Sequence, residues 1–241
     1  MNSSDTTVAA SWTFDKLLWS PRTLAMAAVT FFPVIIALIY RVITAIGLEP
    51  PVTGFAFFSV VTAMVGFPFV APMLALFYSS GVLIDEMETG TIPFLITRPV
   101  HRHRFLLGKM IGSFLLLVLL FLPPMVLCFY LTVAPGGWQQ IGIRFPTLAL
   151  DSGVAILGIA AYSGLFALLG TVLRRPVLAG LIFVFGWQAA ATYVPGLVRQ
   201  LTVAHYLQSL LPHESFQGAL AGLFSSRSSS FVSISALLAI I

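Results

Sequence analysis

The apolar residues of this chain are gathered into long runs, and short polar segments separate the runs. About 20 consecutive apolar residues are enough to cross the hydrocarbon core of a bilayer as an α-helix. The last run, at 231–241, covers only about half of that core at a rise of about 1.5 Å per residue, so we expect an incomplete sixth span that continues beyond Ile241. The earlier runs predict membrane spans at 23–46, 57–80, 105–134, 149–172 and 177–194.

The composition supports the interpretation of these runs as membrane spans. Of the 241 residues, 59% are hydrophobic and 8% are charged, whereas a soluble domain has about 25% charged residues. So few charges cannot cover a water-facing surface, and the bilayer must therefore be the solvent of this protein. We predict an all-α fold, a polytopic transmembrane helical bundle of about six spans, in which residues 23–241 form a single transmembrane domain.

The segment before the first span has a different character. Residues 11–22 mix tryptophans with charged side chains, which is typical of a helix that lies on the membrane surface. An ordinary flank with interfacial tryptophans remains an alternative. We accordingly expect residues 1–22 to form a cytoplasmic N-terminal segment with an interfacial helix.

Glycine and proline mark the expected irregularities of the chain. Gly66, Pro68 and Pro72 predict a kink in the second span. Residues 135–148 are expected to form a loop, and residues 195–230 an external segment with short helices, since none of its apolar stretches is long enough to cross. Close approach between helices is expected at five glycines: Gly158, Gly164, Gly170, Gly180 and Gly186.

The distribution of basic residues predicts the orientation. With the N-terminus inside, the cytoplasmic segments carry Lys16, Arg22, Arg98, Arg102, Arg104, Lys109, Arg174 and Arg175. The external side carries Arg41, Arg144, Arg199 and Arg227. Because cytoplasmic loops are enriched in Lys and Arg, this distribution favours a cytoplasmic N-terminus. The same scatter of basic residues along the span ends, with a net charge of +4, suits lipid headgroups better than nucleic acid.

The segment from residue 81 to residue 109 is the only long charged stretch. An acidic block is followed by a Gly and Pro break, a short apolar element and a basic block. A compact feature of this kind can dock into a groove of a cytoplasmic partner, with apolar anchors for affinity and charges for register. A solvated loop that obeys the positive-inside rule is the alternative. The residues in question are Asp85, Glu86, Glu88, Thr89, Gly90, Thr91, Arg98, Pro99, Arg102 and Lys109.

These residues resemble the hallmark of a known family. The stretches Glu86–Thr91, Leu95–Val100 and Gly108–Lys109 are similar to the segment that links the second and third helices of ABC type-2 exporter permeases. The resemblance extends to the order of the spans and to the external helices before the last one. It implies that 81–104 is a cytoplasmic coupling segment that sits on a separate ATPase subunit.

The resemblance also implies the partners and the location. Two ATPase chains and two permease chains, identical or different, would form one exporter in the cytoplasmic (inner) membrane of a bacterium or archaeon. ATP and Mg²⁺ would be bound by the ATPase partner and no cofactor by this chain. In agreement, the chain lacks a GxxxxGK[ST] phosphate-binding loop, because Met110 follows Gly108-Lys109 and His103 takes the place of the first glycine.

Other chemistry finds little support in the sequence. The four histidines, His101, His103, His205 and His213, are not arranged as a metal site, because His101 and His103 are predicted on the face opposite to the other two. No set of nucleophile, base and acid suggests catalysis. An intramembrane enzyme would need converging ionisable groups at membrane depth. A channel, or a scaffold subunit of a larger complex without an ATPase, remains the alternative to an exporter.

Polar residues within spans are candidates for a transport path. They are Tyr162, Ser163, Gln188 and Thr192, although helix packing explains them as well. Because the span centres otherwise offer aliphatic and aromatic side chains, we expect an amphiphilic substrate and not a small inorganic ion, which needs polar groups to replace its water.

Overall fold

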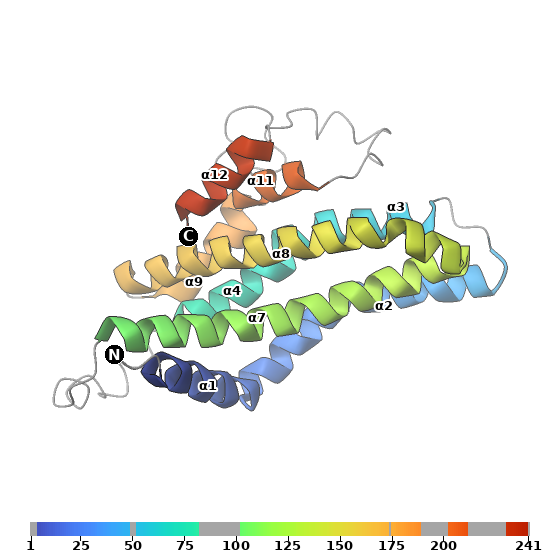
Figure 1. The fold of residues 1–241 in the computed structure, drawn as a ribbon. Coiled ribbons are helices and arrows are strands. Elements are labelled where there is room, and N and C mark those ends of the chain that lie inside the picture. Colours follow the sequence, from blue (N-terminus) through green and yellow to red (C-terminus); the bar gives the residue numbers. More distant parts are fainter. Residues whose placement is uncertain are drawn as a thin grey trace.

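The computed structural model describes residues 4–48, 52–81, 102–173, 175–188, 202–211 and 230–240. Every regular element in these ranges is helical, which confirms the predicted all-α class (Figure 1). Four helical stretches in the described part are long and apolar enough to cross a membrane. They occupy Pro21–Ala45, Gly54–Ser79, Phe105–Gly136 and Trp138–Val172.

Two helices open the chain, and a tight turn separates them. Helix α1, Ser4–Leu18, packs along the start of α7, and α2, Pro21–Ala45, leaves it as the first long apolar helix. The side-chain oxygen of Ser20 caps α2 by accepting a hydrogen bond from the backbone N–H of Arg22. Pro21 occupies the first helical turn, where its missing N–H costs nothing. The Ser-Pro pair therefore ends one helix and starts the next.

The second span is continuous but not regular. It begins with α3, Gly54–Val61, passes through a π-helical stretch η1, Thr62–Val70, and ends with α4, Ala71–Ser79. Pro68 lies inside the π-helical stretch. Irregular turns of this kind are common where a proline removes a helical hydrogen bond. The irregularity predicted for this span thus takes the form of a π-helical segment.

The third and fourth spans form a hairpin, and here one prediction is wrong. Helix α7, Arg102–Val133, is followed by a single 3₁₀ turn, η2, Ala134–Gly136, and α8 begins at once and covers Trp138–Val172. The loop expected over 135–148 does not form, because the Pro-Gly-Gly turn reverses the chain within a few residues. The polar residues that follow, Gln139, Gln140 and Arg144, are good helix formers and lie exposed on α8.

The C-terminal elements are shorter. Helix α9, Pro176–Leu181, continues into a π-helical stretch η3, Ile182–Gln188. Helices α11, Val203–Leu210, and α12, Ser230–Ile240, pack against each other and against α8. The side-chain amide of Gln208 donates a hydrogen bond to the carbonyl of Ala63, 3.1 Å away, which fastens α11 to the second span.

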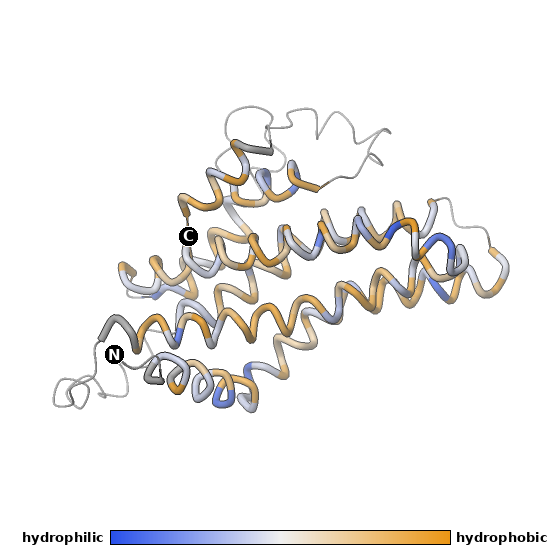
Figure 2. Tube along the Cα trace, in the orientation of Figure 1, coloured by the Kyte–Doolittle hydropathy of each residue, from blue (hydrophilic) through white to orange (hydrophobic). Residues whose placement is uncertain are grey.

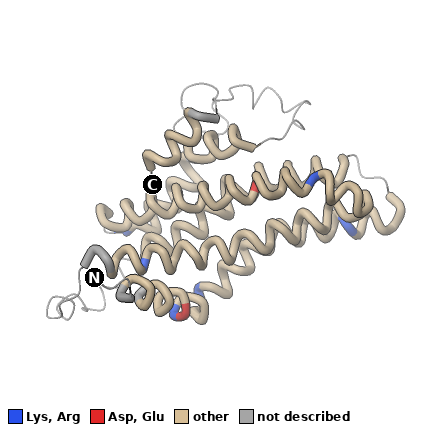
Figure 3. The backbone as a smooth tube through the Cα atoms, in the orientation of Figure 1, with Lys and Arg blue, Asp and Glu red and all other residues tan. Residues whose placement is uncertain are grey.

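The long helices are apolar along most of their length, and their charged residues lie chiefly near helix ends (Figures 2 and 3). Large apolar side chains also cover the outside of α2, where Leu24 is 79% exposed and Ile35 is 55% exposed. Such a surface suits lipid and not water. The core between the spans is aromatic and aliphatic, and its fully buried members include Phe58, Phe67, Leu116, Phe129, Ile159 and Phe166.

Three of the glycines expected at helix contacts are confirmed in that role. A Cβ atom on Gly158, Gly170 or Gly180 would lie within 3.0 Å of a neighbouring helix, against Leu207, Ser80 and Leu76 respectively. At Gly186, a Cβ atom would meet Ile182 of the same helix, 3.7 Å away, and no atom of another helix in the described part of the chain.

Candidate functional site

The predicted coupling residues fall mostly outside the described part of the chain. Eight of them lie within 82–101, and Arg102 begins α7 without a described side chain. These eight are Asp85, Glu86, Glu88, Thr89, Gly90, Thr91, Arg98 and Pro99. Lys109 is described, and so is Gly81, the residue at which the segment leaves the second span. The two line the same surface feature, so the structure defines the base of the segment.

This feature is a recess between α1, α2, the end of α4 and the start of α7. It has about 520 Å³ of unoccupied space, part of it open to the surroundings. We call it the α1–α7 recess. Its lining is Trp12, Thr13, Lys16, Leu17, Arg22, Phe77, Tyr78, Gly81 and Lys109.

Close helix packing builds one wall of the α1–α7 recess. A Cβ atom on Gly112 of α7 would lie 2.5 Å from the backbone oxygen of Ala10 of α1. Real Cβ atoms do not approach a carbonyl oxygen so closely, so only glycine lets these two backbones meet. The small residue at this position therefore sets the distance at which α1 lies along α7.

A hydrogen-bonded chain fixes the other wall. The hydroxyl of Tyr78 on α4 donates to Oγ1 of Thr23 on α2, with an oxygen–oxygen distance of 2.8 Å. The Thr23 hydroxyl in turn donates to the carbonyl of Leu17 on α1. Both Tyr78 and Thr23 are buried. The two consecutive helices α1 and α2 are thus tied to the distant helix α4 at the base of the predicted coupling segment.

Positive charge dominates the α1–α7 recess. The ammonium group of Lys16 lies 5.1 Å from the centre of the Trp12 ring, and that of Lys109 lies 5.5 Å from the centre of the Phe105 ring. Aromatic faces attract cations at such distances. Lys109 is only 7% exposed, whereas Lys16 and Arg22 are exposed. Of the described residues that line the recess, three are basic and none is acidic.

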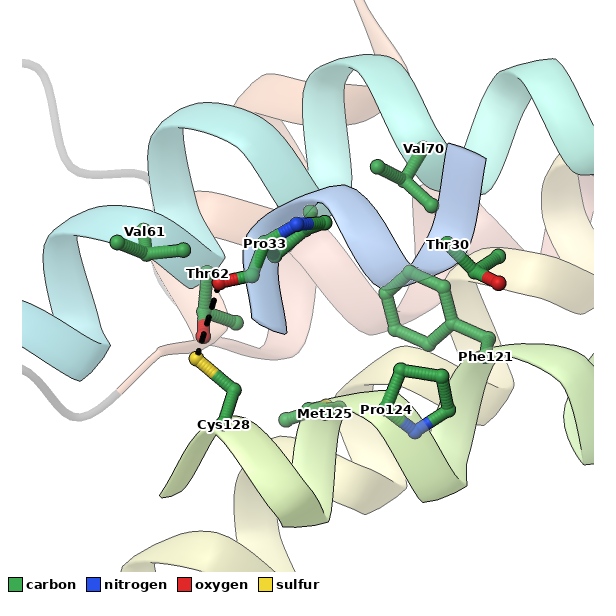
Figure 4. Close-up of a pocket in the computed structure, with 10 residues that line it drawn as sticks. Thr30, Pro33, Val61, Thr62, Val70, Phe121, Pro124, Met125 and Cys128 are labelled. Carbon is green, nitrogen blue, oxygen red and sulfur yellow. Dashed lines mark hydrogen bonds between the residues drawn. The ribbon is translucent and has the colours of Figure 1, made fainter. Parts of the chain in front are cut away.

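A second cavity lies between α2, the α3–η1 helix and α7. It has about 340 Å³ of unoccupied space, part of it open to the surroundings, and we call it the Pro33 cavity. Figure 4 shows side chains of the three helices facing one another across it. Its lining is Thr30, Pro33, Val61, Thr62, Gly66, Val70, Phe121, Pro124, Met125 and Cys128.

The lining of the Pro33 cavity is almost entirely apolar. The Thr30 hydroxyl is engaged with the carbonyl of Ala27, 2.8 Å away, within its own helix. The thiol of Cys128 lies 3.9 Å from the carbonyl of Pro33, in a long contact across the cavity (Figure 4). Few polar groups remain to replace the water around an ion, and apolar surface suits aliphatic or aromatic ligands.

Of the four predicted transport-path residues, Tyr162 and Ser163 have described side chains, and neither is among the described residues that line the two cavities. Tyr162 is fully buried within the bundle, and its ring stacks on Phe166 at a centroid distance of 6.3 Å. The hydroxyl of Ser163 donates to the carbonyl of Ala160 in its own helix. Gln188 ends η3 without a described side chain, and Thr192 lies outside the described residues. The structure thus places Tyr162 in the protein core.

Sequence reasoning missed two features of the candidate site. The Pro33 cavity was not predicted, although Gly66 and the prolines of the spans signalled irregular packing there. The full burial of Asp151, near the start of the predicted span 149–172, was not predicted either. A carboxyl group buried in a candidate span is a functional candidate by default, and only its apolar neighbours in the sequence pointed to burial.

Comparison with known proteins gives one positive result. The family described as "ABC-2 family transporter protein" matches residues 52–241, which includes all the described elements from α3 onward. No curated protein sequence matches the chain.

Proposed function

The chain belongs to the ABC-2 family of transporter proteins, and from this premise we propose that it is the permease subunit of an ATP-driven exporter. In this role it forms the membrane path, and residues 81–104 couple it to a separate ATPase subunit. Members of this family are transmembrane components of transporters. We therefore assign the binding of ATP and Mg²⁺ to two copies of the ATPase partner. A second permease chain completes the complex.

One observation carries this proposal: Gly81, which begins the predicted coupling segment, and Lys109, five residues after its end, line a single interlocked region. Gly81 and Lys109 line the α1–α7 recess together with residues of α1 and α2. Displacement of the segment therefore acts on α1, α4 and α7 together. Packed helices respond to such displacement as bodies, because tightly packed interiors deform little.

The close contacts of α4 with α8 and α9 support transmission of a displacement from the coupling segment to these helices. A Cβ atom on Gly170 of α8 would lie 2.8 Å from the carbonyl oxygen of Ser80, next to α4. A Cβ atom on Gly180 of α9 would lie 2.1 Å from a methyl carbon of Leu76 on α4. With no space between these helices, a shift of α4 toward them also moves α8 and α9.

The coupling experiment uses reversal of charge in the predicted segment. Glu86→Lys and Glu88→Lys are each co-expressed with the ATPase encoded or purified with this chain, and Glu214→Lys serves as the control on the side predicted to be external. We expect both segment variants to insert into the membrane but to lose transport-linked ATP hydrolysis, while the control keeps it. Normal hydrolysis in both variants would reject the role of the segment.

The same purification tests the alternative function. A channel or scaffold subunit would have no ATPase partner, so the wild-type chain would be recovered without a nucleotide-binding subunit. An exporter subunit is expected to bring the ATPase with it in a fixed ratio.

The Pro33 cavity supports an amphiphilic substrate. At about 1.5 Å per residue, Phe121 lies roughly 18 Å along α7 from Lys109. With Lys109 at headgroup level, this distance places the Pro33 cavity near the middle of a hydrocarbon core that is about 30 Å thick. An apolar cavity at that depth can accept the acyl or aromatic part of a ligand that enters from the lipid.

Stimulation of ATP hydrolysis in the reconstituted complex tests the substrate class. We expect a response to members of a panel of lipids and hydrophobic drugs, and a loss of that response when Gly66→Leu fills the Pro33 cavity. A response to a simple inorganic ion, with none to any amphiphile, would overturn this assignment.

A further inference from the structure

We propose that Gln208 of α11 supplies the hydrogen-bond donor that Pro68 lacks, and that it thereby fixes one wall of the Pro33 cavity. Gln208 is a positioning residue, since it is not among the described residues that line the cavity. It acts through the π-helical stretch η1, part of which forms that wall. The proposal requires neither an ATPase partner nor a particular transported substrate.

The backbone of η1 identifies the missing donor. In a π-helix each N–H bonds to the carbonyl five residues earlier, and the N–H of Ala71 does so with the carbonyl of Gly66. By the same spacing, the donor to the carbonyl of Ala63 would come from position 68, which is a proline. Proline has no N–H to donate. The side-chain amide of Gln208 donates to this same carbonyl, 3.1 Å away, and so takes the place of the backbone donor.

The location of Ala63 makes this replacement important. Ala63 is 2% exposed, and a carbonyl within a membrane has no water to bond with, so a missing donor there is costly. The carbonyl lies roughly 13 Å along the second span from Gly54, at a rise of about 1.5 Å per residue. Gln208 thus reaches well into the bundle, although α11 belongs to the segment that is predicted to be external.

Three successive residues of α11 hold it among three neighbouring helices. Leu207 is fully buried, and a Cβ atom on Gly158 of α8 would lie 2.8 Å from one of its methyl carbons. Gln208 bonds to the second span. The hydroxyl of Ser209 lies 2.6 Å from that of Ser233 on α12, in a buried hydrogen bond. Because successive helical residues point about 100° apart, one short helix contacts all three neighbours and keeps the Gln208 amide in place.

The stretch that Gln208 holds also shapes the Pro33 cavity. Thr62 and Gly66, on either side of Ala63 in the sequence, line the cavity (Figure 4 labels Thr62). A π-helical turn contains more residues than an α-helical turn. Conversion of η1 toward α-helical hydrogen bonding therefore changes which side chains face the cavity. Withdrawal of α11 removes the Gln208 donor, and this loss loosens the wall.

The single cysteine of the chain serves as a reporter of this wall. Cys128 is the only cysteine in the sequence and lines the Pro33 cavity. The full chain is reconstituted in phosphatidylcholine vesicles, and the rate at which the Cys128 thiol reacts with N-ethylmaleimide is measured. No ATPase and no transported substrate is present, so failure of the proposed function leaves the outcome of this experiment unchanged.

A double-mutant cycle tests whether Gln208 replaces the donor of position 68. Gln208→Met keeps the length of the side chain and removes its N–H donors. We expect the reaction of Cys128 to become about fivefold faster, which corresponds to the net contribution of one hydrogen bond. Pro68→Ala returns a backbone N–H to η1. In the Pro68→Ala background, Gln208→Met is expected to change the rate by at most about twofold, because the backbone supplies the donor.

The second background also separates this role from misfolding. A general loss of structure in the Gln208→Met variant would not be repaired by Pro68→Ala, whereas the loss of one donor would be. Gln140→Met is the matched control, because Gln140 is exposed on α8. It is expected to leave the rate unchanged in both backgrounds.

Two results would overturn the proposal. An unchanged rate in the Gln208→Met variant would show that this hydrogen bond does not hold the wall of the Pro33 cavity. An equal acceleration by Gln208→Met with and without Pro68→Ala would show that Gln208 stabilises α11 independently of the proline.

Discussion

The α1–α7 recess and the Pro33 cavity lie on the same helix, α7, but they have opposite chemistry. Lys109 lines the first and Phe121, Pro124, Met125 and Cys128 line the second. Twelve residues, or roughly 18 Å of helix, separate Lys109 from Phe121. This distance is close to that between the headgroup level and the middle of a bilayer. The difference teaches that two cavities on one helix can differ in the polarity of their lining according to their distance from the helix end.

The strongest test of this comparison determines whether the α1–α7 recess lies on the cytoplasmic side of the membrane, as predicted. Single cysteines are introduced at Thr97, in the predicted coupling segment, and at Gln140, at the opposite end of α7 and α8, in a Cys128→Ala background. We expect an impermeant maleimide added to intact cells to label the Gln140→Cys variant fully and the Thr97→Cys variant not at all.

Labelling of the Thr97→Cys variant in intact cells would contradict the orientation and would move the recess to the external side. Permeabilised cells provide the control, because both positions should react there.

The largest change in the free energy of unfolding is expected when an aromatic side chain is removed from the wall of the Pro33 cavity. Phe121 is 4% exposed, and its ring lies 6.2 Å from that of Phe67. Phe121→Ala is expected to lower the free energy of unfolding by about 3–5 kcal/mol, because it removes buried contacts and enlarges an existing cavity.

Leu119→Ala is the matched control on the same helix, because Leu119 is 49% exposed and is expected to matter little in lipid. Reversible unfolding in mixed detergent micelles measures both variants. Equal effects in the two variants would mean that the Pro33 cavity is not closed by Phe121.

A smaller change in the free energy of unfolding is expected when the contact between α1 and α7 at the α1–α7 recess is disturbed. Gly112→Ala places a methyl group 2.5 Å from the Ala10 carbonyl oxygen, and the backbones must separate. We expect a loss of about 1–3 kcal/mol in the free energy of unfolding, the usual cost of overpacking.

Gly142→Ala is the control, because a Cβ atom at Gly142 meets nothing within 4 Å. Its expected effect is a gain of about 0.5–1 kcal/mol, since alanine is the better helix former. A neutral Gly112→Ala variant would show that α1 does not depend on this contact.

The smallest effect is expected from the hydrogen bond between Tyr78 and Thr23. Tyr78→Phe removes the donor hydroxyl and keeps the ring, so the free energy of unfolding should fall by about 0.5–1.5 kcal/mol. Tyr130→Phe is the control on an exposed side chain. If both variants are equally stable, the hydrogen bond does not tie α4 to α2.

The predictability of the molecule differs between its spans and its sites. The first three long apolar runs coincide closely with helices of the structure, and the fourth lies within a helix that begins earlier, at Trp138. Their length and hydropathy leave few alternatives in a bilayer. The prediction of a loop over 135–148 was wrong. Polarity alone does not distinguish a loop from a short Pro-Gly-Gly turn that is followed by polar helix-forming residues. The predicted coupling residues were chosen from sequence, and most of them lie outside the described residues.

The sequence by itself determined the fold class, the approximate course of four spans and the family, because these depend on composition, periodicity and a local motif. Only the tertiary structure decided that Lys16, Arg22 and Lys109 line one recess. The same holds for the Pro33 cavity and for Tyr162, which lies in the core. The physical reason is that these properties arise from contacts between helices distant in sequence. Such contacts depend on close approach at individual residues, as at Gly112, and not on hydropathy.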